Sequence, residues 1–198
     1  MNKYTRALSR DDLSQWLIHL TKPVWQNGPA ASAFDVLREI MHTYQVRPST
    51  SDAITRYDSQ GAACFYEVPL QNYDELISTN PNGRRGYGII VSKVAFWEKG
   101  GRPAIYTDNP DNQEWPASER VRLIATDLVR GPTPLDWTHE REWRIRGPLT
   151  LEAHAVDWCW PCVEKIIDAQ VLFREFPGNF SIYVLELRRV LAKQEILV

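Results

Sequence analysis

The chain has 198 residues, 43% of them hydrophobic and 24% charged, which is the composition of an ordinary globular domain of moderate size. Lys and Arg number 23 against 25 Asp and Glu, so the net charge of −2 indicates no bulk attraction to nucleic acid or to an acidic membrane surface. Three cysteines, an N-terminus without an apolar leader and the lack of a long apolar run argue against a disulfide framework and a membrane span, so we expect a cytoplasmic protein.

The first predicted strand covers residues 16–21 and stops before Pro23. Alternate residues of a strand point to the same side, so His19 and Thr21 share one side and the apolar Ile18 and Leu20 the other. A polar pair in this position is either hydrogen-bonded within the fold or part of a binding site. Residue types alone leave both interpretations open.

A helix is predicted after Ser32, which can cap it, and apolar residues recur on one of its faces at Phe34, Leu37, Ile40, Met41 and Tyr44. The Ser/Thr-rich residues 47–51 then predict a turn, and Arg56 follows this turn. Further along, residues 62–66 predict a strand and residues 73–77 a short helix. Residues 87–94 predict a buried β-branched strand, and residues 104–106 another short one.

Apolar residues at positions 121, 124, 125, 128 and 129 share one face of a predicted helix, which ends at Gly131. Residues 143–145 predict a strand, Pro161 predicts the start of a short helix, and residues 171–173 and 182–191 predict the last strands. Strands and helices are interleaved without regular βαβ spacing. We therefore predict a single α+β domain over residues 1–198, with a mixed central β-structure and short flanking helices.

Glu140 and Glu142 stand two residues apart in the segment 139–145, where a strand is predicted to begin. In an extended chain they share one side, with Arg141 on the other. Two carboxylates aimed at one place repel each other unless a cation, a metal or a substrate lies nearby. The segment is therefore either a candidate site or a solvated, charge-alternating edge strand.

Cys159 and Cys162 form a Cys-x-x-Cys pair at the start of a predicted helix, which is the arrangement of a thioredoxin-type dithiol. The pair lies late in the chain, however, rather than after the first strands of a βαβ unit. Zinc would need two further ligands, and only Cys64 and scattered histidines remain, so no metal site is predicted. Tryptophans that pack in the fold, with cysteines that are incidental, are the favoured interpretation, and thiol redox chemistry is the alternative.

An ordered set of short motifs extends over roughly residues 16–146. The set consists of His19-Leu20-Thr21, the Ser/Thr-rich turn with Arg56, Cys64-Phe65-Tyr66-Glu67-Val68-Pro69-Leu70, Tyr87-Gly88, Pro103-Ala104-Ile105-Tyr106 and Glu140-Arg141-Glu142-Trp143-Arg144. This succession resembles the AbiGi-like proteins of bacterial abortive phage resistance and, more distantly, the DarT-type ADP-ribosyltransferases that modify DNA. The resemblance implies an ADP-ribosyltransferase-like fold with NAD as the substrate.

The resemblance also implies catalytic roles for the two glutamates. Cleavage of the bond between nicotinamide and ribose passes through an oxocarbenium-like state, as glycoside cleavage does. Glu142 would stabilise the positive charge that develops on the ribose, and Glu140 would orient or deprotonate the acceptor.

Further residues are implied to bind NAD. His19 and Thr21 would hold the adenine-side ribose and the nicotinamide amide, and the planar guanidinium of Arg56 would grip the diphosphate. Tyr87 or Tyr66 would stack on the nicotinamide ring. His19 stands where arginine-modifying transferases carry an arginine, so the chain combines features of two subgroups.

Two functions are compatible with these residues. The first is an NAD-dependent transferase that modifies a nucleic-acid or protein acceptor in a phage-defence or toxin–antitoxin system, and it predicts that the site residues meet in an open cleft. The alternative is a non-catalytic antitoxin or interaction module of the same fold, as AbiGi-like proteins are also described as antitoxin partners. This module predicts that Glu142 is closed in a salt bridge with Arg141, Arg144 or another cation, which leaves no cleft.

Overall fold

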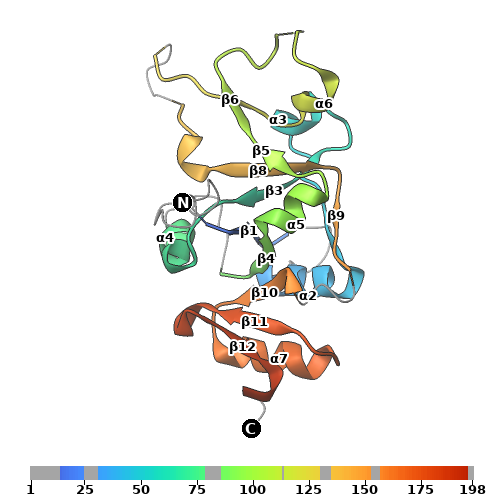
Figure 1. Cartoon of the computed structure of the whole chain (residues 1–198), viewed down its shortest axis with the longest axis vertical. Helices are drawn as coiled ribbons and strands as arrows, with labels where there is room; N and C mark the ends of the chain where they lie inside the picture. The colour runs from blue at the N-terminus through green and yellow to red at the C-terminus, as the bar shows by residue number, and fades with distance from the viewer. Residues whose placement is uncertain are drawn as a thin grey trace, which may run out of the picture.

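A computed structural model describes residues 14–24, 31–78, 86–112, 114–129, 135–152 and 157–195. Its largest element is an eight-stranded sheet with the strand order β12-β11-β10-β4-β1-β3-β8-β5. The strands are β1 (Trp16–Leu20), β3 (Ala62–Tyr66), β4 (Gly88–Ser92), β5 (Arg102–Pro103), β8 (Glu142–Arg146), β10 (Cys159–Val163), β11 (Ser181–Val184) and β12 (Arg189–Ala192). Figure 1 shows them stacked along the long axis of the molecule, from β12 near the bottom to β5 near the top.

The sheet is mixed, because β10 and β11 pair in parallel while its other neighbours pair antiparallel. Two small sheets accompany it. One pairs β2 (Gln45–Val46) with β9 (Leu149–Thr150), and the other pairs β6 (Ile105–Thr107) in parallel with β7 (Leu123–Ala125). The chain from β6 to β7 contains the short helix α6 (Ala117–Arg120), and this segment is called the β6–α6–β7 unit below.

The helices are short and lie around the sheet. The α-helices are α2 (Ala33–Thr43), α3 (Asp52–Thr55), α4 (Tyr73–Ser78), α5 (Lys93–Glu98) and α7 (Ile166–Glu175), together with α6. The 3-10 helices are η1 (Leu70–Asn72), η2 (Thr138–Glu140), η4 (Leu185–Leu187) and η5 (Lys193–Glu195). None of the helices in the described ranges has the length and apolar character that a membrane crossing requires. The described residues thus form a mixed α+β structure, as predicted.

Helix α2 begins where the sequence predicts it. The Ser32 hydroxyl accepts a hydrogen bond from the Asp35 backbone N–H at 3.1 Å, and the Ser32 N–H donates to the Asp35 carboxylate at 3.0 Å, which is a capping box. Leu37 and Ile40 are buried as expected. Tyr44 instead leaves the predicted stripe, because it ends the helix in the left-handed conformation with φ 51° and is 45% exposed.

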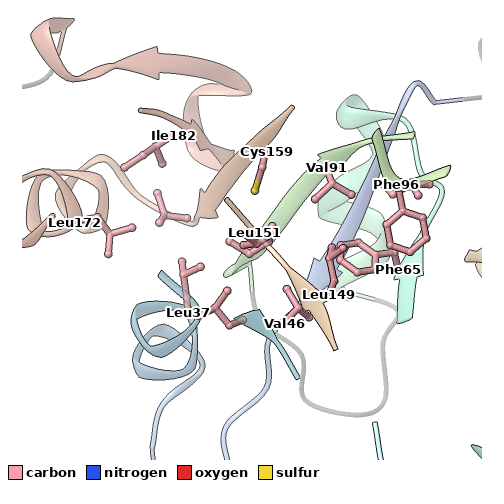
Figure 2. Packing of buried hydrophobic residues seen from close by; sticks show 14 of the residues in the cluster. Leu37, Val46, Phe65, Val91, Phe96, Leu149, Leu151, Cys159, Leu172 and Ile182 are labelled. Carbon is pink, nitrogen blue, oxygen red and sulfur yellow. The ribbon is translucent and has the colours of Figure 1, made fainter. Parts of the chain in front are cut away.

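Side chains from both faces of the sheet build the core. One face carries Leu17, Phe65, Val91 and neighbouring side chains, which pack with α2, α5 and α7 in the larger cluster of Figure 2. The other face carries Ile18, Ile90 and further side chains, which pack with Tyr73 of α4. Burial of a side chain of this size stabilises the fold by about 1.5–3 kcal/mol.

Three predicted elements are wrong, and a fourth ends earlier than predicted. The predicted buried strand 87–94 is confirmed as β4 over Gly88–Ser92 but gives way to α5 at Lys93, which buries Phe96 and leaves Val94 61% exposed. The predicted helix over 121–129 is absent and residues 123–125 form strand β7 instead, because a short apolar run is compatible with either structure and pairing with β6 decides. Pro161 lies inside β10 rather than at a helix start, and residues 171–173 belong to α7 rather than to a strand.

Candidate functional site

Glu140 and Glu142 do not share one side of a strand, contrary to the prediction. Glu140 ends η2, Arg141 is left-handed with φ 42°, and β8 begins only at Glu142. The turn is held by hydrogen bonds from the Glu140 N–H to the Trp137 carbonyl and from the Arg141 N–H to the Thr138 carbonyl. The residue that shares the strand face with Glu142 is therefore Arg144, two positions further along.

Glu142 and Arg144 form an ion pair in the protein interior, where each residue is only 7% exposed. Arg144 Nε donates to Glu142 Oε1 at 2.9 Å, and Nη2 donates to Oε2 at 3.3 Å. Nη1 donates to the carbonyls of Val121 and Leu123 at 3.0 and 3.1 Å. Burial disfavours the charged guanidinium, but the Glu142 carboxylate outweighs this effect and raises the pKa of Arg144 above its ordinary value. Two buried charges of this kind persist because each satisfies the other.

The backbone of Glu142 is fixed as well. Its N–H donates to the Tyr106 hydroxyl at 2.9 Å, and its carbonyl accepts from the Ala104 N–H at 2.8 Å. Burial raises the pKa of Tyr106 to about 12, with the nearby Glu142 carboxylate adding to the effect, so the hydroxyl is neutral near pH 7. Side chain and backbone of Glu142 are thus both held.

The large sheet parts between β1 and β3. These strands share a single register pair, Ile18 with Tyr66, whereas β1 and β4 share five. Beyond that pair, His19 Nδ1 donates to the Cys64 carbonyl at 2.9 Å, so a side-chain hydrogen bond joins β1 and β3 where a backbone hydrogen bond would otherwise continue the sheet. Because a carbonyl only accepts, Nδ1 carries the proton, and Nε2 of the neutral ring has the lone pair.

The side chains of His19 and Glu142 lie on opposite faces of the large sheet. Ile18, Tyr66 and Glu142 are in register across β1, β3 and β8, so their side chains share one face of the sheet. His19 follows Ile18 and points away from that face, with its ring 5.5 Å from the ring of Phe65. The parting of β1 and β3 allows one cavity to contact both residues.

That cavity has a volume of about 1220 Å³ and is lined by residues from distant parts of the chain. Six of the seven predicted site residues line it: His19, Thr21, Arg56, Tyr66, Glu140 and Glu142. The seventh, Tyr87, lies outside the lining, because its hydroxyl donates to Asp168 at 3.2 Å and its ring packs 5.2 Å from that of Phe34. The structure therefore places Tyr66, and not Tyr87, at the cavity.

Thr21 is hydrogen-bonded within the fold, which is one of the two interpretations that the sequence left open. Its hydroxyl lies 2.8 Å from the Ala33 carbonyl and 2.9 Å from the Tyr87 carbonyl, and its N–H donates to the same Tyr87 carbonyl. Thr21 is 2% exposed. The residue thus ties the end of β1 to the start of α2 and to β4, while its surface lines the cavity.

Basic and hydroxyl side chains also line the cavity. They are Lys22, Arg47, Ser49, Thr50, Ser51 and Arg56. Arg47 pairs with Glu39, whereas Arg56 is exposed, lies 4.7 Å from the ring centroid of Tyr57 and has no carboxylate partner within the described residues. The lining also includes Trp137, which is 38% exposed and stacks on His139 at 6.5 Å. The cavity therefore combines cations and hydroxyls, aromatic rings and the carboxylates of Glu39, Glu140 and Glu142.

The Cys-x-x-Cys pair is not at an exposed helix N-terminus. Cys159 and Cys162 lie in β10, both are buried, and both thiols are free. Burial raises the pKa of Cys159 to about 12 and that of Cys162 further still, so neither thiol ionises readily. The redox alternative is contradicted by this placement. Among the described residues, no group of three His, Cys, Asp or Glu side chains is arranged to hold a metal ion.

Comparisons with protein-family models, with curated proteins and with solved structures gave no match for this chain. The geometry of the site and the motifs of the sequence therefore carry the functional argument.

Proposed function

We propose that this protein is an ADP-ribosyltransferase that cleaves NAD and transfers ADP-ribose to a nucleic-acid or protein acceptor, in a bacterial phage-defence or toxin–antitoxin setting. The observation that carries the proposal is the shared cavity. Its lining unites residues predicted from the motifs although they lie in separate segments, from His19 to Glu142. The ADP-ribosyltransferase-like fold and the cytoplasmic setting belong to the same proposal.

The chemistry of the lining suits a dinucleotide. A diphosphate needs cations and hydroxyl donors, which Arg56, Lys22 and the Ser49–Ser51 turn supply in the cavity lining. An aromatic ring needs a flat face to stack on; Trp137 and Tyr66 both line the cavity, Trp137 being 38% exposed and Tyr66 only 3%. A volume of about 1220 Å³ exceeds that of most small-ligand pockets, as a ligand with two nucleosides requires.

Glu142 would act on the reacting ribose. When the bond between nicotinamide and C1′ breaks, its electron pair leaves with nicotinamide and positive charge develops on the sugar. A carboxylate fixed in a buried setting stabilises that charge more strongly than it would in water. Arg144 engages both oxygens of Glu142, but each oxygen keeps a lone pair for a ribose hydroxyl.

Glu140 would act on the acceptor. It ends η2, before the left-handed Arg141, and so lines the cavity from a segment that is not part of strand β8. This geometry suits a division of labour in which Glu142 stabilises the sugar cation and Glu140 takes the proton from the attacking acceptor hydroxyl or amine as its bond to C1′ forms. The acceptor itself is not fixed by these residues.

The experiment is NAD turnover by the purified protein, with Glu142→Gln as the test variant. Release of nicotinamide is measured with water as acceptor and with added DNA, RNA or bacterial protein, and transfer is followed with NAD labelled in the adenylate half. We expect Glu142→Gln to lower turnover on the order of 100-fold or more. Glu152→Gln, at an exposed glutamate paired with Lys99 outside the cavity, is the matched control and keeps activity. Wild-type protein that releases no nicotinamide under any of these conditions refutes the proposal.

One observation favours the second candidate, a non-catalytic interaction module. Both Glu142 oxygens are already engaged by Arg144, which is the closed salt bridge that such a module predicts. The open cavity beside this pair favours the enzyme instead. The module predicts that Glu142→Gln binds a cognate toxin or antitoxin as tightly as wild type does, and that neither protein consumes NAD.

A further inference from the structure

Arg144 connects the candidate catalytic carboxylate to a separate part of the fold. One side of its guanidinium holds the Glu142 carboxylate, and Nη1 holds the carbonyls of Val121 and Leu123. Those carbonyls belong to the segment that leads from α6 into β7. One buried side chain therefore links β8 with the β6–α6–β7 unit.

The same region also holds the backbone of Glu142. The Tyr106 hydroxyl, which accepts from the Glu142 N–H, comes from β6, and the Ala104 N–H, which donates to the Glu142 carbonyl, immediately precedes β6. The β6–α6–β7 unit is in turn closed by hydrogen bonds from Ile105 N–H to the Arg122 carbonyl and from Thr126 N–H to the Thr107 carbonyl. Any shift of this unit relative to β8 therefore acts on Glu142.

Arginine is suited to this task in a way that lysine is not. Its guanidinium is planar and carries five N–H donors in fixed directions, so it can bind a carboxylate and two carbonyls at the same time and set the plane of the carboxylate. A lysine would keep the positive charge but could not fix the orientation of the carboxylate plane. A reacting carboxylate misplaced by about 1 Å loses on the order of 100-fold in rate.

We propose that Arg144 is a positioning residue that fixes the plane of the Glu142 carboxylate at the cavity and ties it to the β6–α6–β7 unit. The catalytic consequence rests on the proposed function, whereas the structural tie does not. The unit thereby becomes part of the active-site architecture although its strands lie outside the large sheet.

The first test measures the tie without using activity. Amide hydrogen exchange is compared for wild type, Arg144→Met and Arg146→Met, with the amides of β4 as an internal reference for global unfolding. Arg146 is the matched control, since it lies on the same strand but is 58% exposed and pairs with Asp58. We expect the Ala104 and Ile105 amides to exchange roughly tenfold faster or more in Arg144→Met than in Arg146→Met, relative to β4.

The second test measures positioning by NAD turnover. Arg144→Lys and Arg144→Met are expected to lower kcat on the order of 100-fold with KM for NAD unchanged, because binding survives and orientation is lost. In Arg144→Ala, millimolar guanidinium chloride restores part of kcat, whereas equal concentrations of urea or sodium chloride do not. A residue that only stabilises the fold would not show this selective rescue. If Arg144→Met does not fold, the charge-retaining Arg144→Lys decides.

The outcomes separate the two proposals. Wild-type protein that consumes no NAD defeats the proposed function, and the exchange measurement then still decides whether Arg144 ties the unit to Glu142. If NAD is consumed but Arg144→Lys and Arg144→Met match Arg146→Met in kcat, the positioning role is overturned and the proposed function stands. Unchanged exchange at Ala104 and Ile105 overturns the tie.

Discussion

Strands β8 and β10 make an instructive pair. Each has five residues and belongs to the same large sheet. Each also carries a short motif of side chains that can take part in catalysis, Glu-Trp-Arg in β8 and Cys-x-x-Cys in β10. In β8 a buried ion pair lines a cavity, whereas in β10 the two thiols are enclosed by the core. Reactive side chains thus become a candidate site only where the fold leaves space beside them.

Position in the sheet explains the difference. β10 lies between β4 and β11 with regular pairing on both sides, so little space remains near it. β8 pairs with β3 in full but lies beyond the point where β1 and β3 part. The separation of β1 from β3, rather than any single residue, leaves space for the cavity beside β8.

The largest effect expected is on the buried charges of β8. Arg144→Met leaves the Glu142 carboxylate without its partner in the interior, and we expect the free energy of unfolding to fall by about 3–5 kcal/mol. Urea denaturation measures the change. Arg146→Met, which breaks a more exposed ion pair on the same strand, should change stability by less than about 1 kcal/mol. Equal losses of stability from the two substitutions would show that the Glu142 carboxylate is not buried in the protein interior.

A smaller loss of stability is expected from a substitution in β4, which lies between β1 and β10. Gly88 of β4 faces Leu20 of β1 on one side and Cys162 of β10 on the other. A Cβ at this position would stand 2.1 Å from the His19 carbonyl oxygen, which is a backbone atom and cannot move aside without shifting β1. Gly88→Ala should therefore cost about 1–3 kcal/mol in thermal or urea unfolding. A Gly88→Ala protein as stable as wild type would mean that β1 and β4 are packed less closely.

The reactivity of the three cysteines tests whether the thiols of β10 are enclosed while the cavity beside β8 is open. With a pKa of about 12, Cys159 is a thiolate in only ~10⁻⁴ of molecules at pH 8, and Cys162 is less reactive still. Cys64 is half-buried and lines the cavity. A thiol reagent should modify one cysteine in the native protein and three after unfolding, and Cys64→Ala should abolish the native reaction. Rapid native modification of Cys159 or Cys162 would reopen the redox alternative.

The smallest effect concerns an ion pair far from both strands. Arg38 and, to a lesser extent, His42 hydrogen-bond Glu175 and lower the pKa of its carboxyl below the ordinary value of 4.5. A lowered folded-state pKa gives stability that is present above pH 4.5 and is lost as the pH falls through the folded value. Glu175→Gln should therefore remove part of the stability at neutral pH, less than about 1 kcal/mol, and converge with wild type in acid. A difference that grows on acidification would contradict this sign.

The sequence predicts some features well and others not at all. Strands β1 and β3 and helix α2 have local signals, namely short, largely apolar runs and a capping residue at Ser32, and these elements fall close to their predicted bounds. The motifs also select six residues that line one cavity. Periodicity fails at residues 121–129 and 171–173, because short apolar runs suit a helix or a strand and only tertiary pairing decides.

The local geometry of the site could not be read from residue spacing. Placing both glutamates on one face assumed an extended chain through Arg141, whose left-handed conformation depends on the preceding 3-10 turn. The partner of Glu142 did have a signal, since Arg144 stands two residues along the same strand. That its guanidinium also reaches the Val121 and Leu123 carbonyls depends on contacts distant in sequence.

The most direct measurement is a crystal structure of the Glu142→Gln variant soaked with NAD. The account predicts NAD in the cavity, with its diphosphate at Arg56 and the Ser49–Ser51 turn, an aromatic ring against Tyr66 or Trp137, and the nicotinamide ribose within hydrogen-bonding distance of residue 142. NAD bound elsewhere on the protein, or a cavity that stays without NAD at millimolar concentrations, would contradict it.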